Sequence, residues 1–127
     1  MQATRIQELK AKLMESAALV QQMVSLSLSH LAPGGINSFD EVMALENRVN
    51  YLEMSIDALS IKLIALFQPE AKDLRRILMM YRINSDLERL GDQAVNIAES
   101  ACKLSATDIE EQDRSEEHTS ELQSRQV

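Results

Sequence analysis

The sequence predicts an all-α protein, an antiparallel three-helix bundle, from three observations. Apolar residues recur at helical spacing along three long segments. Only three glycines and two prolines occur in 127 residues, and most of them fall between those segments. Aromatic residues make up 3% of the chain, so aliphatic side chains and methionine must form the core. Short breaks between long amphipathic helices favour antiparallel neighbours, and we expect one such bundle over residues 1–105.

The first expected helix runs from about residue 3 to residue 31. Ala32-Pro33-Gly34-Gly35 follows and should end it, because proline lacks a backbone donor and glycine is conformationally free. We interpret His30, in the last turn, as a favourable contact with the helix dipole rather than as a metal ligand. The apolar side is expected to consist of Ile6, Leu9, Leu13, Ala17, Val20, Met23 or Val24, and Leu28 or Leu31.

The second expected helix has the most regular apolar pattern of the three. Ser38 and Glu41 match the capping box that starts many helices. The helix should end at Phe67 or Gln68, because the residue before Pro69 is disfavoured from the helical region. Two heptad positions form a seam typical of contact with antiparallel neighbours. They are Val42, Val49, Ile56 and Leu63, and Leu45, Leu52, Leu59 and Leu66.

Pro69 is expected to open a third helix that runs to about Leu104. Gly91 lies inside this helix, where it costs about 1 kcal/mol relative to alanine. We therefore expect Gly91 to permit the close approach of a neighbouring helix or of a bound group. The predicted seam of this helix consists of Met80, Ile83, Leu87, Leu90, Ala94, Ile97, Ala101 and Leu104.

Two pairs of carboxylates repeat one spacing in the second and third helices. Glu53 and Asp57 form one pair, and Glu88 and Asp92 form the other. Residues four apart stack on one helix face, where like charges cost about 0.2–0.5 kcal/mol per pair. We expect both pairs to flank the seams on the solvent side, where their oxygens would suit Mg, Ca, Mn or iron.

The alternative is that these faces are ordinary solvated surfaces. Glu88 and Asp92 would then be paired with Arg82 or Arg89. Spacing alone does not separate this interpretation from a metal site.

Composition excludes several functional classes. The net charge of −7 argues against a nucleic-acid partner, which normally meets a basic patch. The single cysteine, Cys102, cannot form an intramolecular disulfide. No apolar run reaches the roughly 18 residues of a membrane span, and no signal-peptide pattern follows the N-terminus. We therefore expect a soluble, cytoplasmic protein.

No arrangement of nucleophile and base is visible, so no catalytic residue is predicted. The three helices also lack the Glu-x-x-His motif of buried di-iron enzymes, which argues against a redox enzyme of that class.

Residues 106–127 differ from the rest, because they are polar and lack helical periodicity. Residues 114–124 read as an in-frame translation of a common DNA-sequencing adapter. We therefore expect a disordered or artefactual tail, which would leave the natural chain truncated near Asp113.

Four segments occur in a distinctive order. They are residues 52–57, the Gln68-Pro69 turn, residues 73–75, and residues 83–97, which contain Asp-Leu-Glu-Arg-Leu-Gly-Asp. Together they resemble one repeat of the PhoU family of phosphate-signalling regulators, and the resemblance covers about residues 3–104. It implies a three-helix bundle per repeat and two repeats in a full chain, of which this sequence resembles the N-terminal one.

The resemblance also implies a function. PhoU-family members are non-enzymatic, cytoplasmic regulators that act between the ATPase subunit of the phosphate ABC transporter and a sensor histidine kinase. They bind metal clusters through Glu or Asp, three residues, then Asp, which matches Glu53 with Asp57 and Glu88 with Asp92. The implied cofactor is a divalent or iron ion, and the implied contact with the membrane is through partners only.

With the second repeat missing, we expect exposed apolar surface and a homodimer. The alternatives are an adaptor bundle without metal, or an accessory protein of a low-affinity phosphate transporter.

Overall fold

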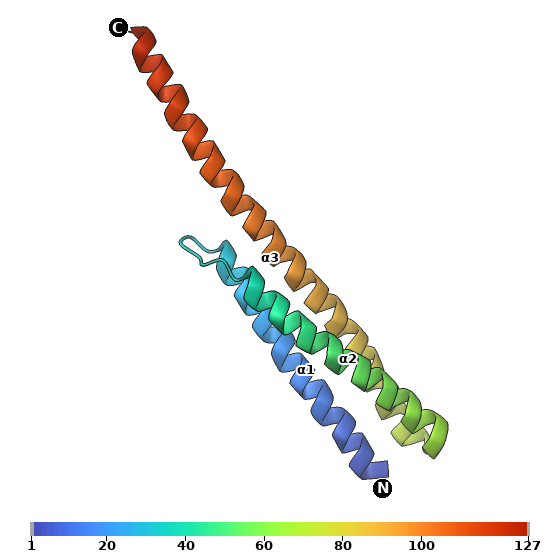
Figure 1. Ribbon diagram of the computed structural model, residues 1–127. Helices are drawn as coiled ribbons and strands as arrows, with labels where there is room; N and C mark the ends of the chain where they lie inside the picture. The colour runs from blue at the N-terminus through green and yellow to red at the C-terminus, as the bar shows by residue number, and fades with distance from the viewer. Residues whose placement is uncertain (1, 127) are drawn as a thin grey trace.

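The computed structural model describes the backbone of residues 2–126 and the side chains of residues 3–106. Three helices follow one another, α1 (Gln2–Leu31), α2 (Phe39–Phe67) and α3 (Ala71–Gln126). Each helix packs against both of the others. Figure 1 shows α2 running antiparallel to α1 and to α3, as short connections require. The predicted all-α, antiparallel three-helix bundle is confirmed.

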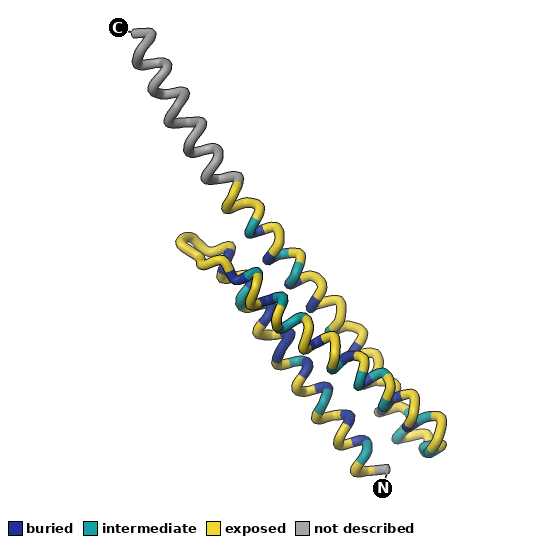
Figure 2. The backbone as a smooth tube through the Cα atoms, viewed as in Figure 1, coloured by how far each residue is buried: buried dark blue, intermediate teal, exposed yellow. Residues whose placement is uncertain are grey.

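The core follows a heptad pattern along α1 and α2, with positions a and d facing inward. On α2 the four residues at position a are buried, whereas those at d are half-buried except for the exposed Leu66. On α1 the buried positions also include two serines and the C-terminal histidine. Figure 2 shows the buried residues along the sides of the helices that face one another. The buried positions of α1 are Ile6, Leu9, Leu13, Ser16, Leu19, Val20, Met23, Ser27 and His30.

The seam of α3 differs from the prediction by one residue at every second position. The d positions Met80, Leu87, Ala94 and Ala101 face inward, but Ile83 and Leu90 are exposed. Two of the a positions, Gly91 and Ala98, are small enough for α1 and α2 to pack closely against α3, and the larger Leu90 and Ile97 one position earlier lie at the edge of the core. The buried a positions of α3 are Ile77, Asn84, Gly91 and Ala98.

The start of α2 is as predicted, but the capping box does not form. No side-chain hydrogen bond caps the helix at Ser38. Its Oγ donates instead to the backbone carbonyl of Leu26 at 2.8 Å, which anchors the loop to α1. The Oδ1 of Asn37 accepts the backbone N–H of Phe39 at 3.0 Å. A long-range contact has therefore replaced the local one.

The connections also follow from their sequences. Gly35 lies so close to the last turn of α1 that a Cβ there would collide with the carbonyl oxygens of Ser29 and His30. At the other end, Gln68 adopts a left-handed conformation with φ 40° and ends α2 where Pro69 predicts. His30 lies in the last turn of α1 as expected, but its ring is buried and its Nδ1 has no hydrogen-bond partner.

Helix α3 continues past Leu104, where the predicted apolar seam ends, to Gln126. No glycine or proline follows Leu104 to break a helix. The predicted disordered or artefactual tail, residues 106–127, falls almost entirely outside the residues whose side chains are described, and it stays a prediction. Within the described part of the chain, no helix combines the length and the apolar character needed to cross a bilayer.

Candidate functional site

The candidate site lies along the line where α2 meets α3. Glu53 occupies the heptad position beside the a position of α2, on the side facing α3, and its residue is only 7% exposed. The prediction that Glu53 lies on a solvent-facing flank is therefore wrong. The reason is the face that α3 turns inward, because the buried Asn84 lies at the level of Glu53 and the contact between the two helices there covers the Glu53 side chain.

Asn84 joins the two helices at the level of Glu53. It is 2% exposed, and its Nδ2 donates to Asp57 Oδ1 at 2.9 Å and to the backbone carbonyl of Glu53 at 3.3 Å. Its Oδ1 is buried without a hydrogen-bond partner. A buried amide oxygen left in this state is costly, so Asn84 is a polar group available to a ligand beside the carboxylates.

The electrostatics of this line are those of crowded carboxylates. Burial, reinforced by the negative charge of Glu88, raises the pKa of Glu53 to about 7. Burial and the neighbouring Asp92 carboxylate raise the pKa of Glu46 from its ordinary value. Both groups are thus held closer to their neutral forms, which a bound cation would reverse.

The structure places the four predicted ligands unequally. Glu53 is buried and Asp57 is half-buried, whereas Glu88 and Asp92 are exposed. The two pairs are close enough for Glu88, Asp92 and Asp57 all to raise the pKa of Glu53. Among the described residues, however, no group of three or more His, Cys, Asp or Glu side chains is arranged to hold a metal ion. The arrangement brings together the donors without assembling a coordination sphere.

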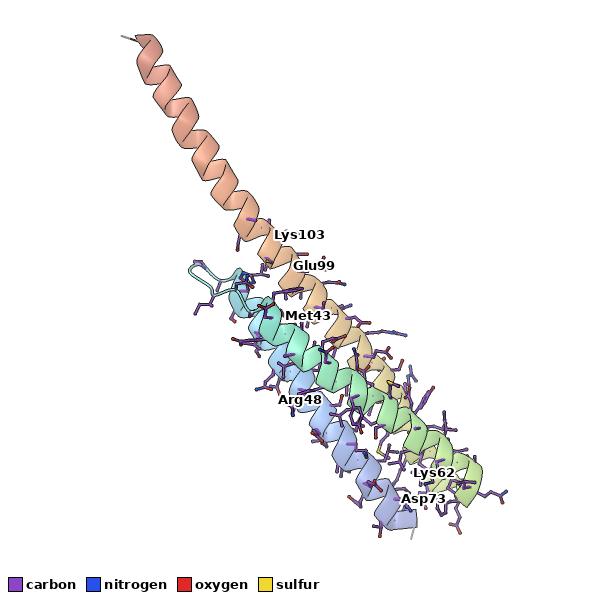
Figure 3. All side chains as sticks on the ribbon, viewed as in Figure 1. Met43, Arg48, Lys62, Asp73, Glu99 and Lys103 are labelled. Atoms are coloured by element: carbon purple, nitrogen blue, oxygen red, sulfur yellow. The ribbon has the colours of Figure 1, made fainter. Side chains whose placement is uncertain are left out.

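The alternative pairing with arginine is not observed. Among residues 3–106, no ion pair joins Glu88 or Asp92 to Arg82 or Arg89. Elsewhere Glu99 pairs with Lys103 one turn along α3, at 3.4 Å (Figure 3). We call Glu46, Glu53, Asp57, Glu88 and Asp92, on α2 and α3, the acidic line. It is therefore not neutralised by the arginines that flank it in sequence.

Sequence reasoning missed two residues of the candidate site, Glu46 and Asn84. Glu46 precedes Glu53 by seven residues and so occupies the same heptad position. Asn84 precedes Glu88 by four residues, so it extends the Glu88 and Asp92 pair by one helical turn. Both signals are visible in the sequence, but neither is specific without knowing which face of α3 is buried.

Side chains of α1 and α2 do reach Gly91, but only to distances that a Cβ would also tolerate. A Cβ on Gly91 would lie 3.4 Å from Glu46 Oε2 and 3.9 Å from Met23 Cε. Gly91 therefore receives one side chain from each of the other helices, and one of these is the carboxylate of the acidic line.

Comparison with known protein families gives the decisive observation. The PhoU domain matches residues 13–101. The chain belongs to the PhoU family. The predicted resemblance to the PhoU family is thereby confirmed, with the match lying inside the predicted range of 3–104. The matched region contains the whole line of contact between α2 and α3 described above.

Curated PhoU relatives show the same similarity. A phosphate-specific transport system accessory protein PhoU homolog of Aquifex aeolicus is 40% identical over 99 residues, 78% of this chain and 45% of that protein. A homolog from Pseudomonas putida is 30% identical over 99 residues, 78% of this chain and 39% of its own length.

PhoU of Escherichia coli is 27% identical over 96 residues, 76% of this chain and 40% of its own length. The chain thus spans less than half the length of these relatives. No solved structure matches.

Proposed function

We propose that this chain regulates phosphate uptake and the phosphate-starvation response by binding other proteins, without catalysing a reaction. Its partners would be the ATPase subunit of a phosphate ABC transporter and a sensor histidine kinase. The observation that carries the proposal is the PhoU-domain match over residues 13–101, with curated relatives named for the phosphate-specific transport system. A cytoplasmic location, with membrane contact only through these partners, follows from the proposal.

The experiment is complementation of a bacterial strain that lacks its own PhoU-family protein. A reporter driven by a starvation-responsive promoter is measured in phosphate-rich medium. We expect the full chain to lower reporter output, and Ser16→Pro, which breaks buried α1, to abolish that effect. Unchanged output from a chain shown to be folded and expressed would contradict the proposal.

The acidic line supports a metal-dependent form of this function. We propose that Glu53, Asp57, Glu88 and Asp92 bind a divalent or iron ion that alters the surface between α2 and α3. The fit rests on the all-carboxylate donor set, on the raised pKa of Glu53, and on the unpartnered Asn84 Oδ1 beside it. When bound, the ion would neutralise carboxylates that otherwise repel one another.

One observation favours a second candidate, an adaptor bundle without metal. The described residues present no ready-made group of three ligands, so the carboxylates would have to move to coordinate an ion. Metal titration of the chain separates the two candidates.

Exposed apolar surface supports the expected homodimer. A groove of about 560 Å³ between α1 and α3 is lined mainly by apolar side chains, with Lys10 and Arg76 among its lining residues. Met14, Met79 and Ile83 line it and remain exposed. Association through this groove would cover them. Sedimentation velocity of Met79→Glu against the parent chain tests it, and an unchanged oligomeric state in the variant would exclude this groove.

A further inference from the structure

The outer face of α2 is apolar where the outer faces of α1 and α3 are polar. Heptad positions c and f point away from the core, and on α2 they are all exposed from Ala44 to Ala65. Tyr51, Met54 and Ile61 at these positions are 76%, 73% and 59% exposed. We call this face the outer stripe of α2. It consists of Ala44, Asn47, Tyr51, Met54, Ala58, Ile61 and Ala65.

The same positions on the neighbouring helices show the contrast. On α1 they include Glu8, Glu15 and Gln22, and all are exposed. On α3 they include Arg82 and Arg89, with Met79 as the one large apolar residue. Helix propensity accounts for the alanines of the stripe, but not for Tyr51 and Ile61, because many polar residues form helices better than tyrosine or isoleucine do. From Tyr51 to Ala65 the stripe keeps an unbroken three-four spacing of apolar residues, which is the pattern by which one helix packs against another.

The exposed charges beside the stripe are basic, although the chain as a whole is acidic and the half-buried Asp57 lies at the opposite edge. Between Ala44 and Ala65, the exposed charged side chains are Arg48 and Lys62. Both are on α2 in Figure 3, fourteen positions apart in the sequence and so at one heptad position. Ser55 occupies that position midway between them.

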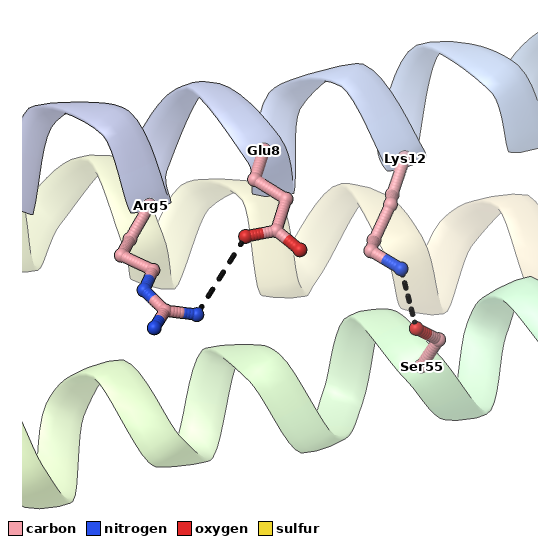
Figure 4. A network of polar contacts seen from close by, with 4 residues as sticks. All are labelled: Arg5, Glu8, Lys12 and Ser55. Carbon is pink, nitrogen blue, oxygen red and sulfur yellow. Dashed lines mark hydrogen bonds and ion pairs between the residues drawn. The ribbon is translucent and has the colours of Figure 1, made fainter.

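A cation from α1 extends this basic edge. Lys12 reaches across from α1 and donates to Ser55 Oγ at 2.9 Å (Figure 4). Next to it, a groove of about 510 Å³ runs between the helices, lined by Lys12, Glu15, Asn47, Arg48, Tyr51 and Leu52. The outer stripe therefore has a cationic border on the side facing α1, with Glu15 as the acid in the groove.

We propose that the outer stripe of α2 is the docking surface for an amphipathic helix of another protein, one that carries acidic residues beside its apolar seam. Tyr51, Met54 and Ile61 would pack against that seam, and Ala58 would allow close approach. Lys12, Arg48 and Lys62 would face the acidic edge. The inference deepens the proposed binding role, but its test uses neither the transporter nor the kinase, so it can fail while the proposed function stands.

Charge argues against an antiparallel pairing of the outer stripe with a second copy of the chain. In an antiparallel pair of α2 helices, residues at one edge position face their equivalents. Arg48 of one copy would then lie opposite Lys62 of the other. Like charges so placed repel, whereas acidic residues would be attracted to both.

The test uses two synthetic helical peptides of about 21 residues with the same leucine seam, one flanked by glutamate and the other by lysine. Each is labelled with fluorescein and titrated with the full chain at about 50 mM and about 300 mM salt. We expect the glutamate peptide to bind about tenfold more tightly at low salt, as expected for a few exposed ion pairs, and the difference to shrink at high salt.

Two variants and a matched control complete the design. Met54→Gln with Ile61→Gln should weaken both peptides, and Arg48→Glu with Lys62→Glu should reverse the preference. Arg82→Glu with Arg89→Glu makes the same change of net charge on the outer face of α3 and should leave the preference unchanged. Far-UV circular dichroism checks that each variant is folded.

Three results would overturn the proposal. The first is equal affinity for the two peptides or binding of neither, and the second is a preference that survives Arg48→Glu with Lys62→Glu. The third is self-association of the parent chain that Met54→Gln with Ile61→Gln abolishes, which would assign the stripe to a second copy.

Discussion

At the scale of single residues, Glu53 couples the stability of the bundle to pH. Burial and nearby carboxylates raise its pKa from an ordinary value of 4.5 to about 7. Between these values the folded chain binds more protons at Glu53 than the unfolded chain does. The contribution of Glu53 to the free energy of unfolding is therefore fully present below pH 4.5 and is lost as the pH rises through about 7.

Glu53→Gln tests this coupling, because glutamine imitates the protonated carboxyl. Without metal, we expect the variant to gain about 1–3 kcal/mol in free energy of unfolding near pH 8, where the parent buries a charge, and almost nothing near pH 4.5. Urea denaturation at both pH values measures the difference. Glu15→Gln, on the exposed face of α1, is the control and should change stability little at either pH. A loss of stability in Glu53→Gln near pH 8 would show that the charge is favourably paired.

At the scale of helices, the heptad pattern of α2 shows what a sequence can predict. Its a positions are large and apolar throughout, so their burial could be predicted directly. Pro69 likewise predicted that the helix ends just before it, at Phe67. The a positions of α3 could not be predicted in this way, because Asn84 and Gly91 do not look like core residues. Their burial depends on Gly91 receiving Met23 and Glu46, and on Asn84 reaching Asp57, which are contacts between helices.

The candidate site was predictable to the same extent. The four-residue spacing identified Glu53, Asp57, Glu88 and Asp92, because spacing is local. The burial of Glu53, and the places of Glu46 and Asn84 beside it, depend on which face of α3 points inward. Residue spacing within one helix does not determine that face. Ser38 makes the same point at a helix end, where Leu26 on another helix takes the hydrogen bond that a local cap would have used.

Gly91 allows the contact between α3 and its neighbours to be tested. A Cβ there would make ordinary contacts with Glu46 and Met23, so Gly91→Ala should gain about 0.5–1 kcal/mol in free energy of unfolding from helix propensity. Gly91→Leu should instead lose about 1–3 kcal/mol, because a larger side chain must push the helices apart. Urea midpoints measured with unchanged m-values report both effects. Destabilisation by alanine comparable to that by leucine would mean that the helices lie closer than the structure shows.

At the scale of the whole molecule, metal binding should show itself as stability. A ligand that binds only the folded chain raises its free energy of unfolding, by about 2.7 kcal/mol at a hundredfold excess over Kd. We therefore expect Mn²⁺, Mg²⁺ or Fe²⁺ to raise the thermal midpoint of the full chain near pH 8. The rise should be smaller near pH 5.5, because Glu53, with a pKa of about 7, must then release a proton to become a ligand.

Paired variants assign that rise to the acidic line. Asp57→Ala with Asp92→Ala should abolish it, whereas Glu15→Ala with Asp86→Ala removes two exposed carboxylates elsewhere and should preserve it. Equal loss in both pairs would mean that ions bind through general negative charge, which is large in a chain of net charge −7. No rise with any of the three ions would favour the adaptor bundle. The crowding that raises the pKa of Glu53 would then be a stability cost at neutral pH that partner binding, rather than a cation, has to offset.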